Sequence, residues 1–434
     1  MQVIKHPSKS TWKQLLERPY IDNTSILNTV NEIVDTVRRG GDGALKELTE
    51  KYDRVSLSDI IVGEQEWEDA GKKISPELKA AIQQASDNIS RFHQAQLREE
   101  ERIETMTGVL CWRRSVAIEK VGLYIPGGTA PLFSTVLMLA IPARIAGCKD
   151  IILCTPANKQ GEVHPAILYV ARLVGISKIC KVGGAQAIAA MACGTESVPA
   201  VYKIFGPGNQ YVTAAKQLVQ MQGIAIDMPA GPSEVCVWAD ETADAAFIAA
   251  DLLSQAEHGP DSQVLLMSTS DDIINKVLEQ VNRQVELLPR KDIALKALKN
   301  SKAIIVHDQA DAIELINSYA PEHLILSCEY AEQMANMITN AGSVFIGHYS
   351  PESVGDYASG TNHTLPTNGF AKTYSGVSVD SFVKKITYQK LTRQGLESIA
   401  ETVIQMAESE GLQAHAQAVR VRSQRLKDYT SRDI

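Results

Sequence analysis

The chain has 434 residues, 44% of them hydrophobic and 22% charged, a balance that is ordinary for a globular protein of roughly two to four domains. Its formal net charge of −8 argues against nucleic acid or an anionic membrane surface as the main partner, and no segment reaches the roughly 18 apolar residues of a membrane span. Because Met1–Ser10 lacks the apolar core of a signal peptide and the seven cysteines form no C-x-x-C pair, we expect free thiols and a cytoplasmic protein.

The first part of the chain is predicted to be helical and without chemistry. Residues 1–22 read as a polar N-terminal arm with a short helical piece around Trp12–Glu17. Helical hairpins are predicted over residues 23–115, one of them opening at Ser75-Pro76, since proline is favoured in the first helical turn. We expect this helical part to pack with the second of the two αβ units that follow.

From Val116 the pattern changes to short β-branched runs that alternate with helical ones, which favours a mostly parallel sheet with helices on both faces. The strands expected in this first αβ unit, residues 116–232, are Val116–Tyr124, Asp150–Thr155, Lys178–Val182 and Val201–Phe205. The helices expected between them lie near Ser134–Ala146, Pro165–Val174, Gln186–Ala192 and Tyr211–Gln220.

Three strand exits of this unit are rich in glycine: Pro126-Gly-Gly128, Gly183-Gly184 and Gly206-Pro-Gly-Asn209. Each leads towards a helix, whose N-terminal N–H groups suit a phosphate. Any one of them is more often only a tight turn, but three in one unit indicate a nucleotide-binding crevice at the carboxyl ends of the strands. The standard dinucleotide fingerprint is absent, because there is no G-x-G-x-x-G and Cys154-Thr-Pro-Ala-Asn lacks an acidic ribose ligand.

A second αβ unit is expected over residues 233–373. Its strands are predicted at Val235–Ala239, Gln263–Ser268, Ala303–Val306, Leu324–Leu326 and Ser343–Ile346. Residues 374–434 then return to helices, near Asp380–Lys385, Gly395–Glu408 and Leu412–Lys427. The fold class is therefore two Rossmann-like αβα units with mostly parallel sheets, plus N-terminal helices and a helical C-terminal segment.

The helix predicted at Thr242–His258 is stopped by Gly259-Pro260, and its last turn carries two candidate metal ligands. Gln255 and His258 share a face of its last turn, where free carbonyls and the helix dipole favour a cation. A histidine in this position is more often only a partner of the dipole. Asp251, one turn before Gln255, is a rival ligand.

Two later loops concentrate residue types that transfer protons or bind metals. Glu322 and His323 precede an apolar strand and offer a carboxylate and an imidazole, although such a pair beside a proline is more often a solvated turn. Ser350–Pro366 has little helical or strand propensity, yet it holds Asp356 and His363. A long polar loop in a compact domain usually has a functional reason, and Asp356 suits zinc alongside imidazole.

Several motifs together resemble the histidinol dehydrogenase family. They are Gly122-Leu-Tyr-Ile-Pro-Gly-Gly128, Val182-Gly-Gly-Ala-Gln-Ala187, Phe205-Gly-Pro-Gly-Asn209, Asp227-Met-Pro-Ala-Gly-Pro-Ser-Glu234, Asp251-Leu-Leu-Ser-Gln-Ala-Glu-His-Gly-Pro-Asp-Ser-Gln263, Tyr319-Ala-Pro-Glu-His-Leu324, Gly355-Asp-Tyr-Ala-Ser-Gly-Thr-Asn-His363 and Glu410-Gly-Leu-Gln-Ala-His415. They run in one order from about residue 20 to the C-terminus, and no motif position departs from the family pattern.

The resemblance implies an enzyme of histidine biosynthesis that oxidises L-histidinol through L-histidinal to L-histidine with two NAD molecules. It also implies one zinc ion per site and a homodimer in which the C-terminal segment completes the partner's site. The implied zinc ligands, which also lie at the substrate, are Gln255, His258, Asp356 and His415. Further implied substrate contacts are Ser233, His323, His363 and Glu410. Glu322 and His323 are the implied proton-transfer pair, and Tyr124, Gln186 and Asn209 the implied NAD contacts.

On these implied roles, His323 removes the hydroxyl proton at each stage, Glu322 activates the water that hydrates the aldehyde, and zinc mainly orients the substrate. Two alternatives from other classes remain. A zinc-dependent hydrolase of the same fold would use Glu322 to activate water, but it would need no phosphate-binding turns. A non-catalytic metal-binding module would not need Glu322 and His323 beside the ligands.

Overall fold

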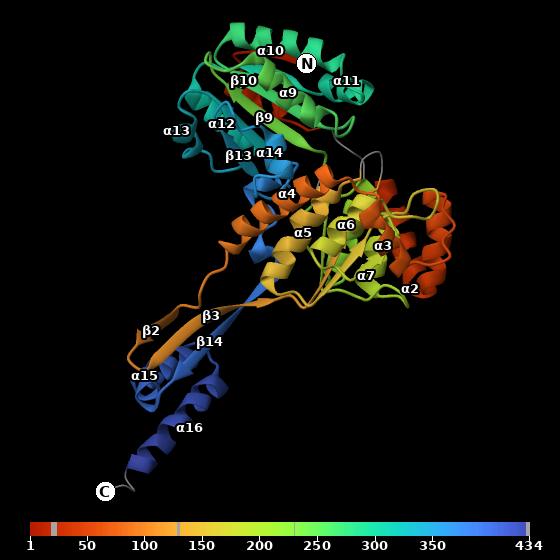
Figure 1. The fold of residues 1–434 in the computed structure, drawn as a ribbon. Helices are drawn as coiled ribbons and strands as arrows, with labels where there is room; N and C mark the ends of the chain where they lie inside the picture. The colour runs from red at the N-terminus through yellow and green to blue at the C-terminus, as the bar shows by residue number, and fades with distance from the viewer. Residues whose placement is uncertain (19–23, 128–130, 230, 431–434) are drawn as a thin grey trace. The chain divides into compact units, whose positions relative to one another are not determined.

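The computed structural model describes residues 1–18, 24–127, 131–229 and 231–430, and the chain divides into two compact units. The main unit comprises Met1–Gln96 and Ile118–Phe382, and the small unit comprises Leu97–Ala117 and Val383–Ile434. The main unit holds two parallel sheets (Figure 1). This confirms the predicted fold class of αβα units with mostly parallel sheets.

The first sheet has the strand order β6-β5-β4-β7-β8, and its strand pairs are parallel. The strands are β4 (Lys120–Tyr124), β5 (Asp150–Cys154), β6 (Lys178–Cys180), β7 (Lys203–Phe205) and β8 (Ala225–Ile226). Side chains of β5 alternate between two apolar cores, with Ile151 and Leu153 in one and Ile152 and Cys154 in the other. This period of two buries both faces of the sheet, as expected for a parallel sheet covered by helices.

The helices between these strands are α5 (Phe133–Ala146), α6 (Pro165–Leu173), α7 (Gly184–Cys193) and α8 (Gln210–Met221). They confirm the predicted alternation to within a few residues. Helices α5 and α6 contribute to the core on one face, and α7 and α8 to the core on the other. Gly128, part of the first glycine-rich exit, lies outside the described residues.

The N-terminal helices are α2 (Thr24–Asp53), α3 (Glu64–Lys72) and α4 (Pro76–Gln94). These helices pack mainly on the first αβ unit and not, as predicted, on the second, although α4 also contacts the second, where Asn88 Nδ2 donates to the carbonyl oxygen of Ala358. Apolar residues of α2 join the core of α7 and α8, and those of α4 join the core of α5 and α6. A helix's apolar stripe shows that it packs, but it does not specify the surface against which it packs.

The second sheet has the order β1-β11-β10-β9-β12-β13, again with parallel pairs. The strands are β1 (Gln2–Lys5), β9 (Glu234–Ala239), β10 (Gln263–Ser268), β11 (Lys302–Ile305), β12 (His323–Ser327) and β13 (Ser343–Ile346). The N-terminal segment is therefore not only a polar arm with a helical piece, because β1 extends this sheet beside β11.

Two helical layers cover this sheet. One comprises α9 (Ala245–Ala256), α10 (Asp271–Val285) and α11 (Lys291–Lys299), which lie together over β9 and β10 in Figure 1. The other comprises α1 (Trp12–Leu15), α12 (Gln309–Tyr319) and α13 (Ala331–Ala335). The expected irregular loop at Ser350–Pro366 contains a short helix, α14 (Glu352–Tyr357), which places the Glu352 and Asp356 side chains one turn apart.

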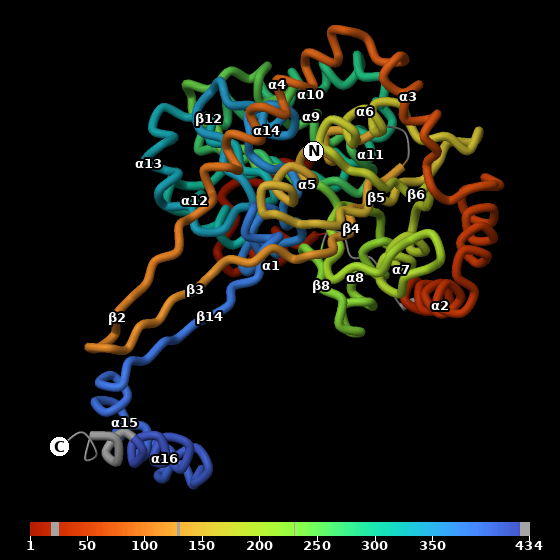
Figure 2. Tube along the Cα trace, turned by 60° about the horizontal axis from the view of Figure 1, so that its bottom comes forward, coloured from red at the N-terminus to blue at the C-terminus, as the bar shows by residue number. Residues whose placement is uncertain are grey.

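The small unit joins two distant parts of the chain. β2 (Arg102–Met106), β3 (Val109–Ala117) and β14 (Val383–Leu391) form an antiparallel sheet, and the three strands run side by side in Figure 2. The helix predicted at Asp380–Lys385 is wrong, since a 3-10 turn at Val379–Phe382 leads directly into β14. The strand predicted at Val116–Tyr124 is two strands, β3 and β4, and the helical prediction is wrong for residues 102–115, which form β2 and most of β3. Helices α15 (Arg393–Ser409) and α16 (Gln413–Thr430) follow as predicted.

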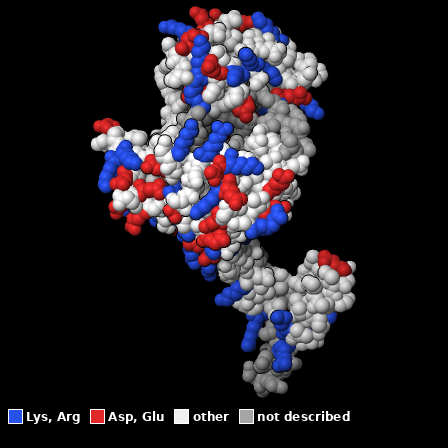
Figure 3. All heavy atoms as spheres, turned by 90° about the vertical axis from the view of Figure 1, so that its right-hand side faces the viewer, with Lys and Arg blue, Asp and Glu red and all other residues white. Residues whose placement is uncertain are grey.

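Lysine and arginine side chains are intermixed with acidic ones on the face of the main unit in Figure 3. Among the described helices, none is both long and apolar enough to cross a membrane. All seven cysteines are free, and Cys154, Cys180, Cys236 and Cys328 are buried.

Candidate active site

A cavity of about 1310 Å³ in the main unit brings together residues that are far apart in the sequence. The glycine-rich loop Gly206–Asn209 lines it from the first sheet, and Ser233 and Glu322 line it from the second. His258 and His363 also face it. The two αβ units thus share a cavity large enough for a small substrate and part of a nucleotide.

The glycine at position 206 is required by the turn that shapes this wall. Its φ is +124°, and a side chain there would place Cβ 2.0 Å from the carbonyl oxygen of Tyr124. Asn209 then caps α8, because its Oδ1 accepts hydrogen bonds from the N–H groups of Tyr211 and Val212. The loop therefore presents the start of α8 to the cavity.

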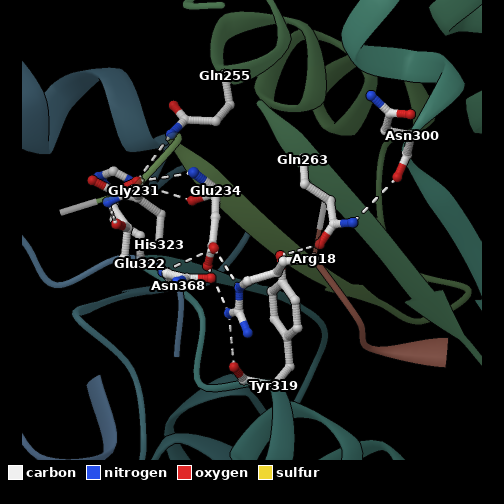
Figure 4. Close-up of polar contacts among 11 residues, drawn as sticks. Arg18, Gly231, Glu234, Gln255, Gln263, Asn300, Tyr319, Glu322, His323 and Asn368 are labelled. Atoms are coloured by element: carbon white, nitrogen blue, oxygen red, sulfur yellow. Dashed lines mark hydrogen bonds and ion pairs between the residues drawn. The ribbon is translucent and has the colours of Figure 1, made fainter. Parts of the chain in front are cut away.

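Glu322 and His323 lie where β12 begins, between β9 and the edge strand β13 of the second sheet, and both are buried. Both are bound to the backbone of Glu234, the first residue of the neighbouring strand β9 (Figure 4). The N–H of Glu234 donates to Glu322 Oε2 at 2.9 Å, and its carbonyl oxygen accepts from His323 Nδ1 at 3.2 Å. In the neutral ring, His323 Nδ1 therefore carries the proton and Nε2 is the acceptor.

Burial and the charges of neighbouring groups shift the pKa values of Glu322 and His323. Desolvation raises the pKa of Glu322 to about 7, with the opposite charge of His323 working against it. Desolvation disfavours the charged form of His323, but neighbouring carboxylates, Glu322 foremost, outweigh it and raise the pKa of His323 to about 10. Shifted values of this kind are typical of catalytic groups.

A candidate metal centre lies beside the pair. Ligand atoms of His258, Glu352 and Asp356 are all within 4.8 Å of one another. Among the described residues, the buried Glu352 Oε2, Asp356 Oδ1 and His323 Nε2 have no hydrogen-bond partner, although the last two are 3.4 Å apart. Unpaired buried oxygens around an imidazole fit a cation such as zinc.

Gln255 joins this centre from the last turn of α9. With its amide nitrogen turned towards Glu352, it donates to Oε1 at 2.6 Å, and its oxygen accepts from the N–H of Glu234 at 3.1 Å. The opposite orientation gives only a 3.4 Å contact with Glu322 Oε2. The first orientation satisfies both ends of the amide and shares the N–H of Glu234 with Glu322, whereas a cation at the centre would favour the opposite one, with the amide oxygen towards Glu352.

Glu352 is a site residue that the sequence analysis missed. Burial raises the pKa of its carboxyl group, and its side chain is almost fully enclosed. The signal was present in Pro351-Glu352 followed by Asp356 four residues later, a spacing that places both carboxylates on one helical face. Asp251, the rival ligand, is not among the acidic residues gathered with His258 in the described part of the chain.

His363 is held beside the centre. Its ring is bound on both sides, with Nδ1 donating to the carbonyl oxygen of Asp356 at 2.8 Å and Nε2 lying 3.1 Å from the hydroxyl of Thr135. Burial lowers the pKa of His363, which favours the neutral ring. Ser233 precedes β9 and lines the same cavity.

The predicted NAD contacts fall in two places. Asn209 lines the cavity, whereas Tyr124 and Gln186 are buried behind the second glycine-rich exit and do not line it. The hydroxyl of Tyr124 accepts from the N–H of Gly184 at 3.0 Å, and Gln186 Nε2 donates to Asp53 Oδ2 at 3.4 Å. Asp53, at the end of α2, is an acidic neighbour that the sequence analysis did not single out.

Glu410 and His415 belong to the small unit. Glu410 caps the end of α15, and His415 lies in the first turn of α16, where its N–H donates to the carbonyl oxygen of Leu412 at 3.0 Å. The structure therefore brings His258 and Asp356 together in the main unit, whereas His415 belongs to a separately folded part of the chain.

Comparisons with known proteins agree on one family. The family model described as histidinol dehydrogenase matches residues 16–423. The chain is similar to histidinol dehydrogenase of Bacteroides fragilis, with 58% identity over 427 residues that cover 98% of this chain and 100% of that protein. It is also similar to the chloroplastic histidinol dehydrogenase of Arabidopsis thaliana, with 53% identity over 98% of this chain and 91% of that protein.

A solved structure is similar over nearly the whole chain. The crystal structure of histidinol dehydrogenase from Elizabethkingia anophelis matches with a TM-score of 0.97 and 54% sequence identity. The match covers 98% of this chain and 99% of that one.

Proposed function

The chain belongs to the histidinol dehydrogenase family, and we propose that it oxidises L-histidinol through L-histidinal to L-histidine, with two NAD molecules as hydride acceptors. The observation that carries the proposal is the shared cavity, in which the carboxylate of Glu322 and the imidazole of His258 face the glycine-rich loop Gly206–Asn209. The chain thus offers proton transfer, substrate binding and a nucleotide-binding turn in one place.

His323 is the proposed base of both oxidations. Its Nδ1–H is bound to the carbonyl oxygen of Glu234, so Nε2 is the atom that can take the hydroxyl proton while a hydride leaves the same carbon for the nicotinamide. The alcohol becomes an aldehyde in the first stage. In the second stage the hydrated aldehyde loses a proton and a hydride in the same way and becomes the acid.

Glu322 is the proposed base for the water that hydrates the aldehyde. Its Oε2 is fixed by the N–H of Glu234, and its side chain reaches the cavity where the aldehyde carbon would lie. Because burial raises the pKa of Glu322 to about 7, the carboxylate is basic enough to accept a proton from water near neutral pH.

Gln255, His258 and Asp356 of the main unit, with His415, are the proposed zinc ligands. When bound there, zinc would orient the substrate through its imidazole and amine, and Gln255 would turn its amide oxygen towards Glu352 and the ion. A divalent cation at Asp356 would also offset the carboxylates that raise the pKa of His323, and would lower it towards the range in which imidazole accepts protons.

Removal of the metal should abolish turnover and leave the fold intact. The proposed ligands lie on α14, at the end of α9 and in the small unit, whereas the core around β9 is formed by apolar residues of the strands and helices. The test is to incubate the protein with histidinol and NAD, with and without a chelator, and to follow the nicotinamide absorbance. Cooperative unfolding on chelation under native conditions would contradict the prediction by making the metal structural.

Glu322→Gln should impair the second oxidation far more than the first, because only the second needs an activated water. Glutamine can still accept the N–H of Glu234, so the shape of the site is kept while the base is lost. We expect the single-turnover rate from histidinal to fall by about 10²–10⁴. Equal losses from histidinol and histidinal would contradict the assignment, and Glu332→Gln on the exposed surface of α13 is the matched control.

We also propose a homodimer in which the small unit contributes His415 and Glu410 to the partner's site. Within its described residues, the small unit has a minor apolar core around Ile404, Ala407 and Ala416. It leaves large apolar side chains exposed, among them Leu97, Ile103, Met406 and Leu412. A unit with so little core gains stability by packing against a second subunit, which a two-fold axis permits symmetrically.

The zinc-dependent hydrolase considered above is not favoured. The family match spans residues 16–423, so it includes the glycine-rich turns for which a hydrolase has no use. A non-catalytic metal-binding module is not favoured either, because the buried pair Glu322 and His323 lies directly beside the candidate metal centre.

A further inference from the structure

Arg18, from the N-terminal segment, makes an ion pair with a buried glutamate deep in the main unit. Its Nε and Nη2 donate to Glu234 Oε1 and Oε2 at 2.5 and 2.8 Å, so both oxygens of the carboxylate are engaged. The Glu234 side chain is only 2% exposed. A buried carboxylate needs such a partner, and the planar guanidinium fork fits both of its oxygens.

Glu234 is also the residue whose backbone holds the catalytic pair. Its N–H is bound to Glu322, its carbonyl oxygen is bound to His323, and its side chain is bound to Arg18 (Figure 4). The backbone N–H of Asn368 adds a further hydrogen bond to Oε1 at 2.9 Å. A single strand-end residue thus connects the N-terminal segment to both proton-transfer groups.

Arg18 also fixes the turn that leads into the pair from the other side. Its Nη2 donates to the carbonyl oxygen of Tyr319 at 2.8 Å, and its guanidinium carbon lies 4.0 Å from the centre of the Tyr319 ring. The next residue, Ala320, has a φ of +53°, a conformation that a residue with a side chain holds only when its surroundings impose it. The turn then continues directly into Glu322.

We infer that Arg18 is a positioning residue for the oxidation: its ion pair with Glu234 and its bond to Tyr319 hold the two backbone segments that carry Glu322 and His323. The inference rests on the proton-transfer roles proposed above for that pair. Positioning errors of about 1 Å can cost about 100-fold in rate, so the loss of a remote clamp should appear in turnover. Arg18 lines the cavity, but as a positioning residue it binds Glu234 and Tyr319 and touches no reacting atoms.

The test is steady-state and single-turnover kinetics of Arg18→Met. We expect kcat to fall by about 10- to 100-fold while KM for histidinol and for NAD changes less than about threefold. The loss should be about equal from histidinol and from histidinal, because both bases are held by Glu234. Arg18→Lys keeps the charge without the fork and should lose less. Lys5→Met, which removes an exposed ion pair with Asp271 from the same N-terminal segment, is the control and should have no effect.

A double variant and rescue by guanidinium separate a loss of positioning from a loss of folding. If Arg18→Met does not fold because it leaves Glu234 unpaired, the Arg18→Met/Glu234→Gln double variant removes both charges and should show the same loss of kcat. Millimolar guanidinium chloride should restore kcat of Arg18→Ala, because the vacated space opens on the cavity, whereas sodium chloride at equal ionic strength should not.

A folded Arg18 variant with kcat within twofold of wild type and only a lower melting temperature would overturn the inference, as would a rise in KM with kcat unchanged. If Glu322→Gln and His323→Asn also kept full activity, the proposed function of the pair would fail as well. If Glu322→Gln and His323→Asn lost activity while Arg18→Met stayed active, only the role of Arg18 would be contradicted.

Discussion

His323→Asn should slow the oxidation of histidinol and the oxidation of histidinal alike, by about 10²–10⁴ each. Each stage removes a proton from an oxygen on the reacting carbon, and His323 Nε2 is the proposed acceptor in both. Asparagine is close in shape to half of the ring, and its amide N–H can still donate to the carbonyl oxygen of Glu234. The variant therefore keeps the local hydrogen bond and lacks only the titrating nitrogen.

Single-turnover rates from each starting compound, at saturating NAD, measure the effect. His348→Asn is the matched control, because His348 lies in the same unit but is bound to Ser327 and Thr242 and faces no substrate in the proposed site. Zinc content of both variants should equal that of the unaltered protein. If His323→Asn slowed only the second oxidation, a group other than His323 would be the general base of the first.

The alternation of strands and helices was predictable because both parallel sheets are buried on two faces. Asp150–Cys154 and Gln263–Ser268 each contain four consecutive apolar residues, which is typical of a strand buried on both faces. The end of α9 was predictable for a local reason, since Gly259-Pro260 cannot continue a helix. These features depend on short-range chemistry, which sequence patterns record.

The small unit was not predictable from such patterns. β14 reads Val383-Lys-Lys-Ile-Thr-Tyr-Gln-Lys-Leu391, and most of its side chains are exposed, so it shows no one-sided apolar alternation. Its partner β3 lies more than 250 positions earlier in the chain, and pairing at that distance leaves no local signal. β1 is four residues long, and it forms a strand because it pairs with β11 at the edge of the sheet, a contact that its own sequence does not indicate.

At the candidate site, motif resemblance identified the residue types but not their arrangement. Glu352 appeared in a polar loop, and only its burial beside Asp356 and Gln255 gives it a role. Glu234 appeared as the last residue of the Asp227–Glu234 motif, and its backbone bonds to Glu322 and His323 depend on the register of β9 against β12. Burial and register are tertiary properties, which a single sequence does not state.

The second large effect expected concerns the sharing of sites between subunits. His258→Ala and His415→Ala homodimers should each be nearly inactive, because every site lacks one proposed zinc ligand. In a mixed dimer whose small units are exchanged, one site receives intact His258 and intact His415, and the other carries both lesions. After random reassortment of equal amounts, half the dimers are mixed, so roughly a quarter of wild-type activity should return.

The experiment is to unfold the two variants together, refold them in the presence of zinc, and assay with histidinol and NAD. Differently tagged chains show whether the subunits have exchanged. A pairing of His258→Ala with His323→Asn is the matched negative control: both residues belong to the main unit, so exchange of small units repairs neither site and no activity should return. If His258→Ala and His415→Ala exchange subunits and likewise regain nothing, His415 serves the site of its own chain. The exposed apolar side chains of the small unit, such as Met406 and Leu412, would then need a different partner surface to cover them.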